Sequence, residues 1–172
     1  MKPFTRFITP VAALAVCSIF SGAAMAEGGD ISGSVALSYT KQEALPVAEA
    51  PGYMVLLGEV KGANKSTGST DYMDGAAVTN REIVRLSQGN GPHSGYITLG
   101  KDGNSTIALW SGEVTTVMSP EGQPQTSFKG NWEYVAGTGK YDGIRGKGEY
   151  HGHFTSQTSY VVDWSGEYSV GK

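Results

Sequence analysis

Three consecutive segments in the last third of the chain alternate between apolar and polar residues, and this alternation limits the possible folds more than any other feature. In residues 128–134, Phe128 and Trp132 share one face, while charged and amide side chains take the other. Residues 147–154 and 160–170 repeat the pattern, each with aromatic residues and glycines on one side. A period of two is typical of strands with one buried face. Three such strands in succession need one shared interior.

Five segments upstream also alternate, although less regularly, and turn signals separate them. They are residues 31–40, 53–62, 76–87, 93–101 and 105–118. The last two are joined through Asp102-Gly103, a strong hairpin signal. We expect two long connections, 41–52 and 63–75, of which the second is predicted to be mobile. The sequence thus predicts an all-β fold, an eight-stranded antiparallel up-and-down barrel (calycin-like), whose closure removes exposed strand edges.

The segments 93–101 and 105–118 carry apolar residues on both faces. Tyr96 and Ile97 are adjacent, and so are Leu109 and Trp110, so each pair must divide between the two sides of a strand. One interpretation is an imperfect register or a β-bulge. The other is that the outer face of these strands contacts another subunit.

The first 26 residues have the features of a cleaved secretory signal peptide. Lys2 and Arg6 form a basic start, an apolar run follows, and Ala24-Met25-Ala26 matches the A-x-A cleavage pattern. The run is too short and too rich in small residues for a typical membrane span. We therefore expect residues 1–26 to be removed and the protein to be periplasmic or secreted.

The remainder, residues 27–172, is expected to form a single β-barrel domain. The only cysteine, Cys17, lies in the predicted signal, so the domain has no disulfide and depends on packing and sheet closure. The full chain has a net charge of −3 at pH 7 and contains no basic block of the kind that nucleic-acid binding needs. We predict no nucleic-acid partner, and no membrane span once the signal is cleaved.

A glycine-rich turn joins the segments around residues 128–134 and 147–154. Its glycines are Gly137, Gly139, Gly143 and Gly146. They allow sharp reversals of the chain. Tyr141 and Ile144 are three residues apart, so one helical turn would aim both to the same side and let them close one end of the barrel. A phosphate-binding loop is disfavoured, because that motif needs a following helix and here another strand follows.

The stretch GTGKYDGIRGKGEY, with the GYITL strand and the Lys-Asp-Gly turn before it, resembles the signature of the allene oxide cyclase-like and dirigent-like barrels. The resemblance covers residues 95–168, and Ala136 stands where the family often has a glycine. It implies an eight-stranded barrel of the calycin type that is often a homotrimer. It transfers no activity, since the lumenal groups that those cyclases and dirigent proteins use lie outside the shared motif.

Candidate site residues are aromatic or acidic and lie in the middle of predicted strands. The aromatic ones, interpreted as core packing or alternatively as the lining of a ligand cavity, are Trp110, Trp132, Tyr150 and Trp164. The acidic ones, interpreted as exterior charges or alternatively as lumenal carboxylates with raised pKa values, are Glu59, Glu82 and Glu113. Glu113 is grouped with the four aromatic residues as a ligand-binding candidate.

His151 and His153 project from one strand face together with Glu149, as ligands do in some metal sites. We interpret them as solvent-facing, because a stable site needs three or four convergent ligands, and we predict no metal and no cofactor. The sequence favours an exported barrel of unassigned role, a non-enzymatic module that binds a small apolar molecule or is structural. The alternative is an isomerase or cyclase-like enzyme with a lumenal carboxylate, and no catalytic residue can be named.

Overall fold

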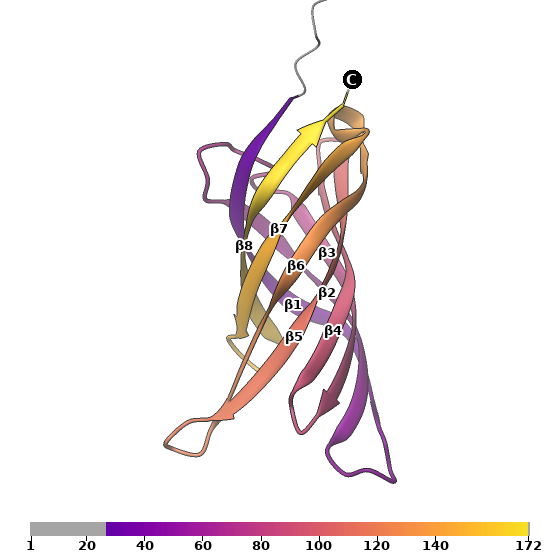
Figure 1. The fold of residues 1–172 in the computed structure, drawn as a ribbon, viewed down its shortest axis with the longest axis vertical. Helices are drawn as coiled ribbons and strands as arrows, with labels where there is room; N and C mark the ends of the chain where they lie inside the picture. The colour runs from indigo at the N-terminus through magenta and orange to yellow at the C-terminus, as the bar shows by residue number, and fades with distance from the viewer. Residues whose placement is uncertain (1–26, 172) are drawn as a thin grey trace, which may run out of the picture.

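The computed structural model describes residues 27–171, which form a closed barrel of eight antiparallel strands in chain order (Figure 1). The predicted all-β, eight-stranded up-and-down barrel is confirmed. The predicted signal peptide, residues 1–26, lies outside the described residues. The elements are β1 (Glu27–Pro46), β2 (Tyr53–Ser66), β3 (Ala77–Ser87), β4 (Gly91–Lys101), β5 (Asn104–Met118), β6 (Pro124–Thr138), η1 (Gly139–Tyr141), β7 (Ile144–Phe154) and β8 (Ser159–Val170).

The connection between the first two strands is shorter than predicted. β1 continues to Pro46 and pairs with β2 along that whole length, so residues 41–46 belong to a strand and only 47–52 connect. This part of β1 is exposed and forms one of the hairpins that extend beyond the barrel at its lower end in Figure 1. Residues 41–46 pair their backbone with β2 while their own side chains stay exposed, so no alternation of apolar and polar residues marks them.

Large side chains fill the barrel wall by lying over inward-facing glycines. A β-carbon added at Gly148 would lie 2.5 Å from Cζ2 of Trp132, and one at Gly166 would lie 2.6 Å from the same atom. Trp164 covers Gly33 in the same way, with its Cζ2 2.5 Å from the position of an added β-carbon. The inward glycines therefore make room for aromatic rings.

One end of the barrel is closed by the connection between β2 and β3. Tyr72 and Met73 of this connection are both buried, each with 4% of its surface exposed. The amide of Asn64 donates to the carbonyls of Tyr72 at 3.3 Å and Met73 at 3.0 Å, and its oxygen accepts from Nε1 of Trp164 at 3.1 Å. The prediction of a mobile loop over 63–75 needs correction, because residues 63–66 belong to β2 and the buried side chains of Tyr72 and Met73 anchor the second part of the connection.

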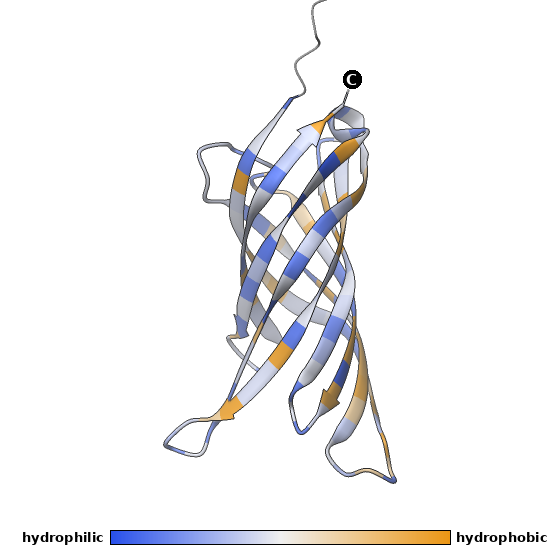
Figure 2. Ribbon diagram, in the orientation of Figure 1, coloured by the Kyte–Doolittle hydropathy of each residue, from blue (hydrophilic) through white to orange (hydrophobic). Residues whose placement is uncertain are grey.

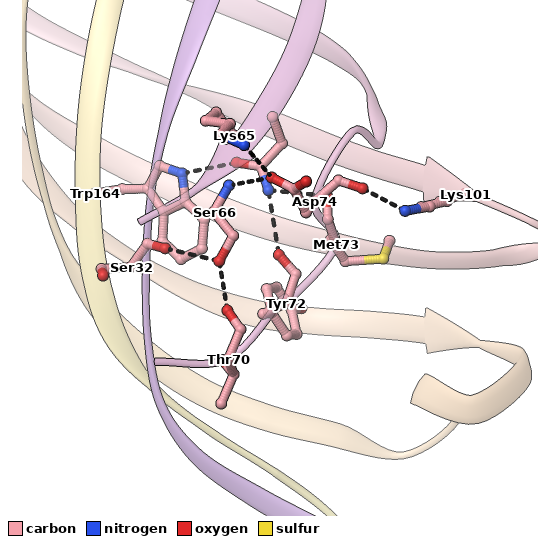
Figure 3. Close-up of polar contacts among 10 residues, drawn as sticks. Ser32, Lys65, Ser66, Thr70, Tyr72, Met73, Asp74, Lys101 and Trp164 are labelled. Carbon is pink, nitrogen blue, oxygen red and sulfur yellow. Dashed lines mark hydrogen bonds and ion pairs between the residues drawn. The ribbon is translucent and has the colours of Figure 1, made fainter. Parts of the chain in front are cut away.

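Further polar contacts fasten the same connection (Figure 3). The carboxylate of Asp74 accepts from the backbone N–H of Ser66 at 2.8 Å and pairs with Lys65 at 3.6 Å. Nζ of Lys101, at the end of β4, donates to the carbonyl of Asp74. These contacts tie the connection to both β2 and β4, so it is a fixed cover of the barrel end.

The glycine-rich turn lies at this closed end. It contains the short helix η1, and Tyr141 and Ile144 are buried with 4% and 0% of their surfaces exposed. The ring centroid of Tyr141 lies 5.4 Å from that of Tyr72, so the turn and the β2–β3 connection meet.

No helix within residues 27–171 is long and apolar enough to cross a membrane.

The strand pairing contains one irregularity next to β5. The pairing of β5 with β6 shifts between Ile107 and Ala108, where Val135 of β6 is the extra residue, whereas β4 pairs with β3 and β5 without a shift. Tyr96 nevertheless points outward and is 53% exposed, as are Leu57 and Ile83 on β2 and β3 at 43% and 49%. The contact of this outer face with another subunit stays a prediction.

Candidate functional site

The barrel encloses a cavity of about 970 Å³. Its lining is mostly apolar and aromatic, and it reaches exposed residues such as Gln42, Pro124 and Gln157, which lie at the end opposite Tyr72 and Tyr141. Exposed apolar residues lie near this open end, among them Val117 and Met118. The end of β5 is coloured as hydrophobic in Figure 2. The volume is within the range of small-molecule sites in proteins.

All four aromatic candidates line this cavity. Trp110, Trp132 and Tyr150 are buried, and Trp164 is half-buried towards the closed end. The structure therefore brings Trp110, Trp132, Tyr150 and Trp164 together around one space.

The placement of Glu113 in the lumen is wrong. Its side chain is exposed on the outer wall, because Trp110 and Val114 point inward and a residue of opposite parity in the same strand must point outward. The acid inside the barrel is Glu82, which is 7% exposed and lines the cavity. Glu59 also lies outside, where it pairs with Arg81 at 3.0 Å.

Glu82 accepts hydrogen bonds on both carboxylate oxygens. The hydroxyl of Tyr39 donates to Oε1, and the hydroxyl of Tyr160 donates to Oε2 at 3.1 Å. Nδ2 of Asn80 donates to Oε2 at 3.0 Å, and Nε1 of Trp110 donates to Oδ1 of Asn80 at 2.8 Å. Because an indole N–H can only donate, this last bond fixes the orientation of the Asn80 amide and directs its NH₂ group to Glu82.

Burial dominates the electrostatics of this cluster. It raises the pKa of Glu82, against the three hydrogen bonds, which lower it. Burial and the neighbouring carboxylate also raise the pKa of the Tyr39 and Tyr160 hydroxyls, so both stay protonated and remain donors. The arrangement can therefore hold a carboxyl group at fixed orientation in a mainly apolar space.

His93 is another ionisable group of the interior. Its Nε2 lies 3.0 Å from the hydroxyl of Tyr150, and its ring lies 4.8 Å from Trp110 and 5.5 Å from Phe128, measured between centroids. Burial lowers the pKa of His93 to about 4, so its ring is neutral at pH 7.

The strand register places Glu82 and His93 near each other. Glu82 pairs with Gly95, two residues after His93 on the neighbouring strand, so the two side chains are diagonal neighbours on the inner face. A β-carbon at Gly95 would lie 2.8 Å from Cζ2 of Trp110, so the indole occupies the space above this glycine. Trp110 thereby links Glu82 and His93. It donates a hydrogen bond to Asn80, which donates to Glu82, and its ring packs against the ring of His93.

The sequence contained a signal that Glu82 faces inward, although Glu82 was interpreted first as an exterior charge. Glu82 has the same parity in its strand as the apolar residues Val78 and Val84, so it had to share their inward face. His93 likewise shares parity with Ile97 and Leu99. No sequence signal, however, shows that Tyr39 and Tyr160 meet Glu82, because this contact depends on the closed register.

The two histidines of β7 lie apart from the polar cluster around Glu82. His151 is on the outer face, where its Nε2 lies 3.7 Å from the carboxylate of Asp163, and both groups are exposed. His153 is exposed near the open end of the cavity. Across residues 27–171, no group of three or more His, Cys, Asp or Glu side chains is arranged to hold a metal ion.

Comparison with known proteins finds a likeness to solved structures and no sequence relative. The chain matches no protein-family model, and no curated protein is similar in sequence. It is similar to the solved structure of the pterocarpan synthase dirigent protein GePTS1, with 13% identity and a TM-score of 0.47, over 95% of this chain and 98% of that one. The likeness is weak, and the closed barrel is established by the strand pairing of the chain itself.

Proposed function

We propose that this barrel is a non-enzymatic binding module that holds a small apolar molecule in its lumen. The observation that carries the proposal is the cavity of about 970 Å³, open at one end and lined mainly by apolar and aromatic side chains. An interior that served only as a core would be filled by side chains at the density of an organic crystal. Export of the module, to the periplasm or beyond the cell, is part of the proposal and is supported by the features of residues 1–26.

A neutral apolar fluorophore, N-phenyl-1-naphthylamine, tests this function. All three tryptophans of the chain line the cavity, so energy transfer from tryptophan to the fluorophore reports a bound molecule. We expect saturable binding to the wild-type protein. Ala108→Phe is expected to weaken that binding by about tenfold or more, because Ala108 lines the cavity and the added ring would fill part of it.

Leu109→Phe is the matched control. Leu109 is the next residue of β5 and points to the outer wall, so the same ring added there leaves the lumen unchanged. Binding that is absent in the wild type, or that Ala108→Phe and Leu109→Phe weaken equally, would overturn the proposal.

The buried carboxyl group favours one second candidate, an isomerase or cyclase-like enzyme. Glu82 and the neutral His93 ring are titratable groups at the wall of the same cavity, where a proton could be given to or taken from a ligand. Incubation of a bound ligand separates the two functions. A carrier returns the ligand unchanged, whereas an enzyme converts it and loses that conversion in Glu82→Gln.

A further inference from the structure

Among residues 27–171, Glu82 is the only acidic residue that lines the cavity, and no lysine or arginine of this part of the chain lines it. Within residues 27–171, no ion pair reaches the Glu82 carboxylate, although Glu59 and Asp74 at the surface each have cationic partners. A buried carboxylate without a countercharge is costly, so proteins generally pair such groups. The interior therefore holds a carboxyl group that forms no ion pair with any cation of residues 27–171.

The hydrogen bonds to Glu82 are arranged for an ionised carboxylate. Tyr39, Tyr160 and Asn80 all act as donors to it, and none of the three needs a proton from it. A carboxylate offers about four lone-pair sites, and these donors take two on Oε2 and one on Oε1. One site on Oε1 remains for a further donor.

The walls next to Glu82 are aromatic. The ring of Tyr160 lies 6.0 Å from that of Tyr39 and 5.3 Å from that of Phe128, measured between centroids. The indole of Trp110 donates to Asn80, which in turn donates to the Glu82 carboxylate. Faces of aromatic rings attract organic cations, and the attraction grows when the cation is removed from water.

We propose that the ligand of this cavity is an organic cation, an apolar body that carries one ammonium group. The ammonium would lie against Oε1 of Glu82, between the rings of Tyr39, Tyr160 and Trp110, and the apolar body would extend towards the open end. This inference rests on the proposed function and adds the charge of the ligand. A neutral ligand would leave the Glu82 charge unbalanced, and an anion would be repelled by it.

Two isosteric probes test directly whether the ligand must be charged. They are 2-phenylethylamine, which is cationic at pH 7, and 2-phenylethanol, which is neutral. We expect the wild-type protein to bind the amine at least about tenfold more tightly than the alcohol, measured by calorimetry. Benzyltrimethylammonium, which cannot donate a hydrogen bond, is expected to keep part of this preference through the aromatic rings.

Glu82→Gln is expected to remove the preference for the amine over the alcohol. Glu113→Gln removes an acid from the outer wall of the barrel and is expected to leave both affinities unchanged. Should Glu82→Gln fail to fold, the ratio of the two affinities in the wild type decides the question alone.

Equal binding of amine and alcohol by the wild type would overturn the inference and leave the proposed function standing. A preference that survives in Glu82→Gln would also overturn it, because the countercharge would then be elsewhere. Failure of both probes and of N-phenyl-1-naphthylamine to bind would instead overturn the proposed function itself.

Discussion

Gly148→Val is expected to lower the free energy of unfolding by about 3 kcal/mol. Gly148 faces the interior on β7, and a β-carbon there would lie 2.5 Å from Cζ2 and 2.6 Å from Cε2 of Trp132. The indole cannot retreat freely, because it lies over Gly166 as well and its Nε1 donates to the carbonyl of Glu149 at 3.3 Å. Urea denaturation, followed by tryptophan fluorescence, measures the change.

Glu149→Val provides the control for this substitution. Glu149 is the next residue of the same strand and points to solvent, so the same branched side chain there has good strand propensity and meets no ring. We expect its stability to lie within about 0.5 kcal/mol of the wild type. Equal stability of Gly148→Val and Glu149→Val would mean that Trp132 does not lie over Gly148.

The second large effect is a loss of stability in acid that comes from His93. Its pKa is lowered by burial from 6.5 to about 4, so the folded protein binds this proton less readily than the unfolded chain does. The stabilisation is therefore complete above pH 6.5, is lost as the pH falls towards 4, and amounts to about 3 kcal/mol over that range. Burial raises the pKa of Glu82, so its contribution has the opposite sign, and stability falls as the pH rises above 4.5.

The carboxylates are present in every variant, so a comparison of variants isolates the contribution of His93 to the pH dependence of stability. His93→Gln is expected to have a flatter stability profile between pH 6.5 and 4 than the wild type, whereas His151→Gln, at an exposed position, is expected to keep the wild-type profile. Urea denaturation at each pH provides the profiles. Parallel curves for His93→Gln and the wild type would show that His93 titrates normally and is not buried.

The fold was predictable because its signals are local. Alternation in residues 128–134, 147–154 and 160–170 reports which face of a strand is buried, and closure follows from the number of such strands. The two connections were predicted wrongly because no local signal marks the contacts that form them. Residues 41–46 pair without burying a face, and residues 67–76 are fixed by side chains such as Tyr72, whose burial depends on contacts with Tyr141 far along the chain.

The candidate site was half predictable. The aromatic residues Trp110, Trp132 and Tyr150 were identified because the interior of a small barrel selects large apolar side chains. The acid was misassigned because a charged residue in a strand is ordinarily outside. Strand parity places Glu82 inside and Glu113 outside, but the donors that make a buried carboxyl tolerable come from distant strands, and no local pattern shows them.

A bromine-labelled neutral molecule, 2-(4-bromophenyl)ethanol, tests most directly whether this barrel holds a ligand in its lumen. In crystals soaked with it, the anomalous signal of bromine locates the molecule without reference to any assumed pose. The predicted result is one peak inside the barrel, beside Trp110 and Phe128, in the cavity that the wild-type side chains leave open. A lumen filled by these side chains, with bromine only on the outer wall or bound nowhere at saturating concentration, would contradict the proposed binding function.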